Sequence, residues 1–163
     1  MTVQQINFIA RVLPAAAVAW QHYGVNAVGM LAQSALETGW GKSAPGNMYF
    51  GIKAGSNWTG KTQTLYTTEY VDGKAVKVPQ VFRAYATPTE SFEDYARLIT
   101  SLTRYSQALN YPGYNQTDNY LSAIVAGGYA TDPNYLNKVV SIANSIKSVV
   151  SEADIINILK KKA

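Results

Sequence analysis

One carboxylate, Glu37, closes a short apolar stretch and is followed by a glycine-rich turn. Upstream of it, apolar residues recur at the spacing of one helical face, so a helix over residues 26–37 is expected to turn this stripe inward. Gly39 and Gly41 break the helical pattern, with Trp40 between them. A carboxyl group that ends an apolar helix beside an indole is poorly solvated, which raises its pKa and keeps a proton on it near neutral pH. Glu37 is therefore a candidate general acid.

Residue type alone favours an ordinary role for Glu37. Most glutamates lie at the surface, and this one could sit in water or pair with Lys42 at the end of the helix. The choice between an ordinary glutamate and a catalytic acid therefore depends on the segments that surround it.

The composition limits the chemistry that could accompany this carboxylate. With 163 residues, 47% of them hydrophobic and 15% charged, the chain is expected to form one globular domain over residues 1–163. It has no cysteine and one histidine, His22, so thiol catalysis, a metal site and a cofactor are not expected. The formal net charge of +4 suits an acidic partner such as an anionic cell wall and is too small to indicate nucleic-acid binding. A hydrolytic reaction would have to use carboxylates or hydroxyls.

The N-terminal segment is expected to fold as part of the domain. Thr2 and Gln5 can form a capping box for a first helix, and the segment lacks the positively charged region that opens a signal peptide. Pro14 is expected to begin a second helical segment, which Gly24 ends. No apolar run is long enough to cross a membrane, so membrane insertion is not expected, and the protein is expected to be a monomer.

Several segments, in a fixed order, resemble one known family. They are AQSALETGWGKS, NMYFGIKAGSNWTGK, TTEY, FRAYATPTESFEDYARLITSLTRY and GGYATDPNYLNKV. Together they are similar, over roughly residues 8–147, to glycoside hydrolase family 73, whose members cut the glycan strands of peptidoglycan. The resemblance implies a mainly α (α+β) fold, namely a lysozyme-like helical domain with a small β-hairpin lobe flanking the glycan cleft. It also implies an endo-β-N-acetylglucosaminidase that cuts the β-1,4 bond after N-acetylglucosamine, with Glu37 as general acid and peptidoglycan as partner.

Residues 62–85 change from helical spacing to strand-forming residues. Asp72 and Gly73 have the sequence of a tight turn, which predicts a β-hairpin. Glu69 comes shortly before that turn, on an element with little core of its own, so it is expected to be mobile. It could pair with a lysine of the opposite strand. However, Glu69 belongs to the TTEY segment, and the resemblance implies that it is a second catalytic carboxylate.

Two carboxylates across a glycosidic bond are the usual equipment for glycoside hydrolysis, and their separation decides the outcome. If the hairpin closes over bound glycan, Glu69 could act as a base toward a water molecule, and the reaction would invert the sugar. If the hairpin stays far away, the acetamido group of the N-acetylglucosamine could act as the nucleophile. The sequence contains no information on the separation, so both routes stay open.

Further residues are predicted to contact the glycan. The resemblance implies that Tyr129, in the YATDP motif, reaches the active site, where its hydroxyl can hold a water or a sugar oxygen near the acid. It also implies that residues 47–51 line the cleft, although Met48 and Tyr49 depart from the usual form of the family. The predicted substrate-binding residues are Trp40, Asn47, Phe50, Trp58 and Tyr135, and the two tryptophans and the phenylalanine are candidate sugar platforms. Core packing is an equal alternative for Phe50, and packing is also the alternative for Tyr129.

The second half of the chain has further helix signals. Thr87, Pro88 and Glu90 open one helix in capping-box form, and the acidic residues of its first turn suit the helix dipole, so they are left out of the catalytic set. Thr131 is expected to cap a later helix. The tail ADIINILKKKA is amphipathic and basic, so it could pack as a last helix or dock on an anionic wall polymer.

Two other functions fit the same residues. A muramidase or lytic transglycosylase also uses a glutamate at a helix end in a similar fold, and a non-catalytic peptidoglycan-binding or scaffold module would use the aromatic residues alone. The expected place of action is the bacterial cell wall or periplasm. With no signal peptide seen, a bacteriophage endolysin released from the host cytoplasm, with antimicrobial lytic activity, is one origin that fits.

Overall fold

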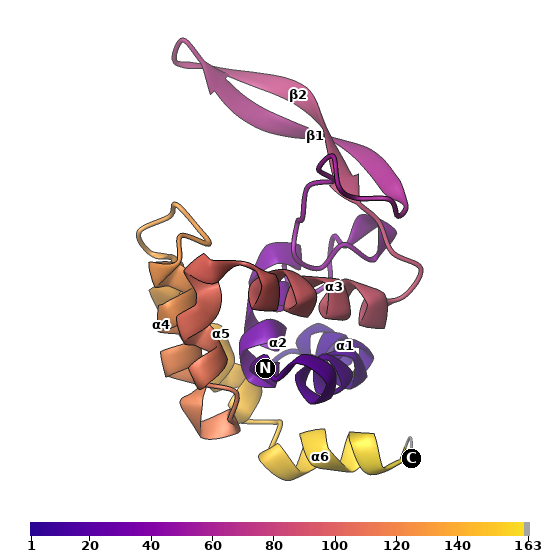
Figure 1. Cartoon of the computed structure of the whole chain (residues 1–163), viewed down its shortest axis with the longest axis vertical. Coiled ribbons are helices and arrows are strands. Elements are labelled where there is room, and N and C mark those ends of the chain that lie inside the picture. Colours follow the sequence, from indigo (N-terminus) through magenta and orange to yellow (C-terminus); the bar gives the residue numbers. More distant parts are fainter. Residues whose placement is uncertain (162–163) are drawn as a thin grey trace.

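The computed structural model describes residues 1–161 and consists mainly of helices, with one two-stranded antiparallel sheet (Figure 1). The helices are α1 (Val3–Tyr23), α2 (Ala27–Thr38), α3 (Pro88–Ser101), α4 (Thr117–Ala126), α5 (Tyr135–Lys147) and α6 (Glu152–Lys161), and the strands are β1 (Thr62–Val71) and β2 (Lys74–Arg83). Short 3-10 turns cover Pro45–Asn47, Thr103–Asn110 and Tyr114–Gln116. The expected helical fold with a small β-hairpin is confirmed.

The first helix, α1, is longer than the sequence predicts. The capping box forms as expected, with the Gln5 backbone N–H donating to the Thr2 hydroxyl at 3.1 Å, and Gly24 ends the helix at a φ of 68°. The prediction that Pro14 begins a separate segment is wrong, because α1 runs through it. A proline inside a helix removes one backbone hydrogen bond. The helix persists because the residues on both sides of the proline, such as Val12 and Ala15, are buried in the core.

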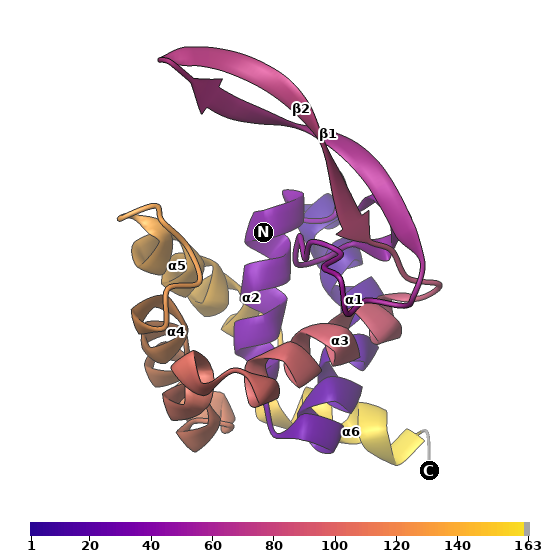
Figure 2. The same cartoon turned by 45° about the horizontal axis from the view of Figure 1, so that its top comes forward.

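Helix α2 is the central element, and it packs against α1, α4 and α5 (Figure 2). Every residue over 27–35 is buried, so the expected inward stripe is in fact a helix covered on all sides. Small residues allow this close packing. A side chain on Gly29 would overlap the ring of Tyr120 on α4. Asn26 caps the start of α2, as predicted, by accepting from the Gly29 backbone N–H at 2.9 Å.

The chain leaves α2 through three consecutive left-handed residues. Gly39, Trp40 and Gly41 have φ values of 59°, 59° and 82°, which a tryptophan rarely adopts. The Thr38 hydroxyl holds this turn together, because it donates to the Ser34 carbonyl at 2.7 Å and accepts from the Gly41 N–H at 2.8 Å. The end of the helix is therefore tightly specified at the residue that follows Glu37.

The hairpin rises away from the helices, and its turn lies on the side of α4 and α5 in both whole-chain views (Figures 1 and 2). Asp72 and Gly73 form the turn with positive φ values of 52° and 77°, as a two-residue hairpin turn requires. Most side chains of β1 and β2 are exposed, and the rings of Tyr66 and Tyr70 are 71% and 77% exposed. The outer hairpin therefore has little core of its own, as the sequence predicts.

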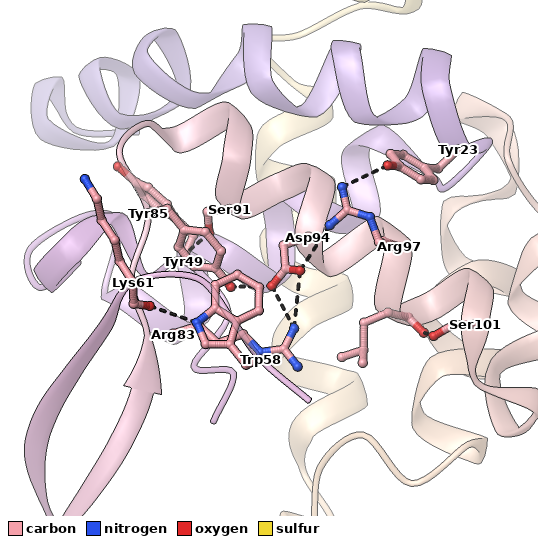
Figure 3. Close-up of polar contacts among 11 residues, drawn as sticks. Tyr23, Tyr49, Trp58, Lys61, Arg83, Tyr85, Ser91, Asp94, Arg97 and Ser101 are labelled. Carbon is pink, nitrogen blue, oxygen red and sulfur yellow. Dashed lines mark hydrogen bonds and ion pairs between the residues drawn. The ribbon is translucent and has the colours of Figure 1, made fainter. Parts of the chain in front are cut away.

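A buried charge cluster ties the base of the hairpin to α3 (Figure 3). Asp94, which is 4% exposed, accepts from Arg83 at the end of β2 at 3.0 Å and from the Tyr85 hydroxyl at 2.6 Å. Arg97 on α3 donates to the same carboxylate at 3.3 Å. Thr87 caps α3 as predicted, by accepting from the Glu90 N–H at 3.2 Å. These bonds fix where the hairpin begins.

The C-terminal helices depart from the sequence prediction at one point. Thr131 does not cap α5, which begins at Tyr135 after Asn134. Asp132 instead braces the preceding turn by accepting from the Asn134 N–H at 2.9 Å. The predicted last helix forms as α6 and packs against α1, with Ile155 buried, while the last two residues of the basic tail lie outside the described residues.

Over residues 1–161, none of the helices combines the length and apolar character needed to span a bilayer. The same residues contain no group of three or more histidine, cysteine, aspartate or glutamate side chains that could hold a metal ion.

We expect Asp94→Ala to lower the free energy of unfolding by about 3 kcal/mol, because it leaves the partly buried Arg83 guanidinium without its partner. Urea denaturation would measure the loss. Asp132→Ala is the matched control, since it removes an ion pair with Lys138 that is exposed and screened by solvent, and its effect should be far smaller. Equal losses in the two variants would contradict a structural role for the Asp94 cluster.

Candidate active site

The carboxyl of Glu37 lies against the backbone of the loop that follows η1, the turn Pro45–Asn47. An ideal Cβ on Gly51 would come within 2.5 Å of the Glu37 Oε1 atom, and Gly51 has a φ of 61°. Position 51 therefore needs glycine for two reasons, its left-handed backbone and the space that the carboxyl occupies. The last turn of α2 and this loop together form the immediate surroundings of the carboxyl.

Burial raises the pKa of the Glu37 carboxyl above its ordinary value of 4.5, as the sequence predicts. The residue as a whole is exposed, yet its carboxyl is crowded by the protein, and the position of this group is what governs its ionisation. The sequence did not predict the neighbour that crowds this carboxyl, which is the backbone at Gly51. Trp40, the predicted neighbour, packs edge-on against Phe8 of α1, with ring centres 6.0 Å apart, and its carbonyl accepts from Gln4.

Two tyrosines, Tyr129 and Tyr135, lie near Glu37. Burial is the largest cause of the raised pKa of Tyr129 and of Tyr135, and the negative charge of Glu37 contributes to both. The two rings lie 6.0 Å apart, and the pKa of Tyr135 is raised to about 12. Gly128, with a φ of 87°, turns the chain after α4 and delivers Tyr129. The structure therefore brings together three of the predicted site residues, Glu37, Tyr129 and Tyr135.

Sequence reasoning missed Gln33, which lies one helical turn before Glu37 on the same face of α2. Gln33 is 1% exposed, and its amide nitrogen donates to the Tyr135 hydroxyl at 3.1 Å. Its amide oxygen accepts from the Tyr95 hydroxyl. The available signal was a polar amide in the middle of an apolar stripe, four residues before the candidate acid.

Glu69, the second predicted carboxylate, lies on the outer half of β1 and is exposed. Along β1 the half-buried residues are Gln63, Leu65 and Thr67, and Glu69 continues this alternating set. Its side chain therefore shares the inward face of the hairpin. Its cross-strand neighbour is Val76, and among residues 1–161 no ion pair involves Glu69. The alternative of a lysine partner gains no support.

Phe50 and Asn47 have structural positions in the described fold. Phe50 is 5% exposed and stacks on Tyr95 with ring centres 4.1 Å apart, so the prediction of an exposed sugar platform is wrong, because its ring faces are covered by the core. The Asn47 amide donates to the Tyr85 carbonyl at 3.1 Å, and the residue has a φ of 54°. Asn47 therefore helps to hold the loop that presents Gly51.

Trp58 lies at the base of the hairpin (Figure 3). Its indole N–H donates to the Lys61 carbonyl at 2.9 Å, and the Arg83 guanidinium lies 4.5 Å from the ring centre. The ring lines a cavity of about 530 Å³ together with charged residues of α3 such as Glu93 and Arg97. Within residues 1–161, no hydrogen bond or ring contact joins Trp58 to Glu37, so the structure does not bring these two predicted site residues together.

Comparison with a family model gives one match that spans most of the chain. Residues 13–148 match the glucosaminidase model, described as mannosyl-glycoprotein endo-beta-N-acetylglucosaminidase.

Individual relatives agree with this match. The chain is 40% identical, over 149 residues and 87% of its length, to the peptidoglycan hydrolase FlgJ of Pseudomonas aeruginosa, of which it covers 37%. It is 34% identical over 94% of its length to the exo-glucosaminidase LytG of Bacillus subtilis, of which it covers 55%. The solved glycoside hydrolase domain of Salmonella typhimurium FlgJ, truncated at its C-terminus, matches with a TM-score of 0.78 and 35% identity, covering 90% of this chain and 99% of that one. The chain spans less than half the length of the FlgJ proteins that it matches.

We expect Gly51→Ala to lower the pKa of Glu37 toward its ordinary value of 4.5, because the new methyl group would push the carboxyl out toward water. A carboxyl titration followed by NMR measures this pKa directly. Gly24→Ala is the matched control, since Gly24 has the same left-handed backbone, with a φ of 68°, and a Cβ there meets no atom within 4 Å. An unchanged pKa of Glu37 in Gly51→Ala would contradict the proposed cause of the shift.

Stability should depend on pH through Glu37. The folded protein holds the proton more tightly than the unfolded chain does, so the contribution of this group to stability is complete below its ordinary pKa of 4.5 and is lost as the pH rises through the raised value. The side chain in Glu37→Gln cannot ionise. The free energy of unfolding of this variant, relative to the wild type, should therefore increase from acidic to neutral pH in denaturant titrations. A difference that stays constant with pH would show that the folded protein does not favour the protonated acid.

Proposed function

The chain belongs to the glucosaminidase family, glycoside hydrolase family 73, and from this premise we propose that it hydrolyses the β-1,4 bond after N-acetylglucosamine in the glycan strands of peptidoglycan. The observation that carries the proposal is the crowding of the Glu37 carboxyl against Gly51 at the end of α2, together with the burial that raises its pKa. The names of the relatives, peptidoglycan hydrolase and exo-glucosaminidase, support the substrate and the type of bond. The proposed place of action is the bacterial cell wall.

Glu37 is the general acid of the proposed reaction. Its proton passes to the glycosidic oxygen while the bond from that oxygen to C1 of N-acetylglucosamine breaks, which leaves an oxocarbenium-like centre at C1. A carboxyl with an ordinary pKa would be almost fully ionised at neutral pH and could not supply this proton. The raised pKa is therefore the property on which the first step depends.

Glu69 is the proposed base for the second step. A water molecule attacks C1, and Glu69 accepts one of its protons, so that attack from the face opposite the leaving group inverts the sugar. The support from geometry is that Glu69 shares the inward, partly buried face of β1 with Leu65 and Thr67. The outer hairpin has little core, so it can close on a glycan strand with little loss of packing.

Tyr129 and Tyr135 are the proposed polar contacts beside the acid. Their hydroxyls lie near enough to Glu37 for its charge to raise the pKa of both, and a buried phenol stays protonated throughout the neutral range. Such a hydroxyl can hold a sugar oxygen or the attacking water in place. Trp40, which is half-buried at the end of α2, is the proposed apolar contact for a sugar ring.

We expect Glu37→Gln to lower the rate of peptidoglycan cleavage by a factor on the order of 10² to 10⁴, because the amide cannot donate the proton. Release of soluble fragments from purified sacculi measures this rate. Glu69→Gln should reduce the rate less, and Glu152→Gln, on the distant helix α6, should leave it unchanged. Full activity of Glu37→Gln would remove Glu37 from the mechanism, and a larger loss in Glu69→Gln would mean that the two roles are reversed.

Mass spectrometry of the released fragments tests which bond is cut. Reducing N-acetylglucosamine ends support the proposed function. Reducing or anhydro muramic ends would instead identify a muramidase or a lytic transglycosylase. Binding to sacculi without any release of fragments would identify a non-catalytic module.

A further inference from the structure

A chain of hydrogen bonds runs from the core to the candidate active site and crosses four helices. The Tyr120 hydroxyl of α4 lies 2.7 Å from the Tyr95 hydroxyl of α3. Tyr95 contacts the Gln33 amide oxygen on α2, and the Gln33 amide nitrogen lies 3.1 Å from the Tyr135 hydroxyl on α5. Tyr120 and Tyr95 are both fully buried, so bulk solvent does not reach this end of the chain.

The buried end determines the direction in which every proton points. Over residues 1–161, the Tyr120 hydroxyl has one hydrogen-bond partner, the Tyr95 hydroxyl. Tyr120 must therefore donate to Tyr95, because a buried hydroxyl proton without an acceptor costs roughly 1–3 kcal/mol. Tyr95 then donates to the Gln33 amide oxygen, and the opposite end of the amide donates to the oxygen of Tyr135. Because the Tyr135 oxygen already accepts a hydrogen bond from the Gln33 amide, the proton of the Tyr135 hydroxyl is free to point elsewhere.

We infer that Gln33 is a positioning residue, which orients the Tyr135 hydroxyl so that its proton is donated into the site beside Glu37. The inference rests on the proposed function and concerns how the Tyr135 hydroxyl is oriented in that site. A tyrosine hydroxyl can donate or accept, and a reversed amide would turn the Tyr135 proton inward to Gln33. The tyrosine pair in the core disfavours that reversal, so Tyr135 presents a donor to the site in most molecules.

A fixed donor has a definite use in the proposed reaction. When Glu37 gives its proton to the glycosidic oxygen, a carboxylate forms in a crowded, poorly solvated place. The Tyr135 hydroxyl, held by Gln33 one helical turn before Glu37, has a proton free to turn toward this charge and can stabilise it. The Tyr135 proton would lower the free energy of the state in which Glu37 has lost its own.

A double-mutant cycle tests whether Gln33 acts through Tyr135. We expect Gln33→Leu to lower kcat about tenfold, which is less than the 10²-fold or greater loss typical of removing a preorganised donor outright. In a Tyr135→Phe background the same change should cost less than about twofold, because the group that Gln33 positions is already gone. KM should change little in either background. An equal loss in both backgrounds, or no loss in kcat, would overturn the inference.

Tyr95→Phe extends the test along the chain and covers the case in which Gln33→Leu fails to fold. It removes the hydroxyl that donates to the Gln33 amide oxygen, so the amide can reverse and kcat should fall about threefold or more. Tyr114→Phe is the matched control, because it also removes a tyrosine hydroxyl bond, here to the Val150 carbonyl, but outside this chain. Its kcat should stay at the wild-type value even where its melting temperature falls. Equal kcat losses in the two phenylalanine variants would reduce the chain to a purely structural role.

The pKa of Glu37, measured by carboxyl NMR, separates this inference from the proposed function. The Tyr135 donor favours the ionised carboxylate, so Gln33→Leu and Tyr95→Phe should raise this pKa further, and Tyr114→Phe should not change it. An unchanged pKa in Gln33→Leu overturns the inference whether or not the wild type cuts peptidoglycan. A raised pKa in a protein whose wild type releases no fragments would support the inference and reject the proposed function.

Discussion

The close approach of one carboxyl to one glycine backbone is the constraint on which the site depends. Glu37 occupies the space that a side chain at position 51 would need, and this crowding keeps its carboxyl short of water. Because desolvation penalises the charged form, the pKa of this carboxyl lies above that of an ordinary surface glutamate. The left-handed turn after α2 and the Asn47 bond to Tyr85 both help to hold the Glu37 carboxyl against the Gly51 backbone.

The packing of the helices explains why Glu37 is held in a fixed position. Helix α2 is buried on all sides over residues 27–35, and its small residues allow α4 to approach closely at Gly29. Gln33 places a polar group in this apolar surrounding and satisfies it with hydroxyls from α3 and α5. A fully bonded polar group inside a core permits few alternative packings, so these helices are held in one arrangement around Glu37.

The hairpin is packed differently from the helices. It is anchored at its base by the Asp94 cluster and by Trp58 under the Arg83 guanidinium, while its outer half is largely exposed. A rigid base and a poorly packed tip suit an element that meets a polymer and then releases it. The body therefore presents the acid in a fixed place, and the second carboxylate is carried on the part of the fold with the least packing.

The sequence by itself determined the features that depend on near neighbours along the chain. The caps at Thr2, Asn26 and Thr87, the Asp72–Gly73 turn and the position of Glu37 at a helix end all follow from residues a few positions apart, and all are present in the structure. The family resemblance added Tyr129 and Tyr135, which the structure places near Glu37. The role of Glu69 stays a prediction.

Only the tertiary structure decided which distant residues meet. It put Gly51 against the acid, buried Phe50 on Tyr95, placed Trp58 at the hairpin base, and joined Gln33 to a tyrosine 102 residues away. Helix spacing and turn rules act over about one turn of chain, so they cannot say which faces of separate helices will pack together. Burial and the need to pair every buried polar group made that choice, and both are properties of the assembled core.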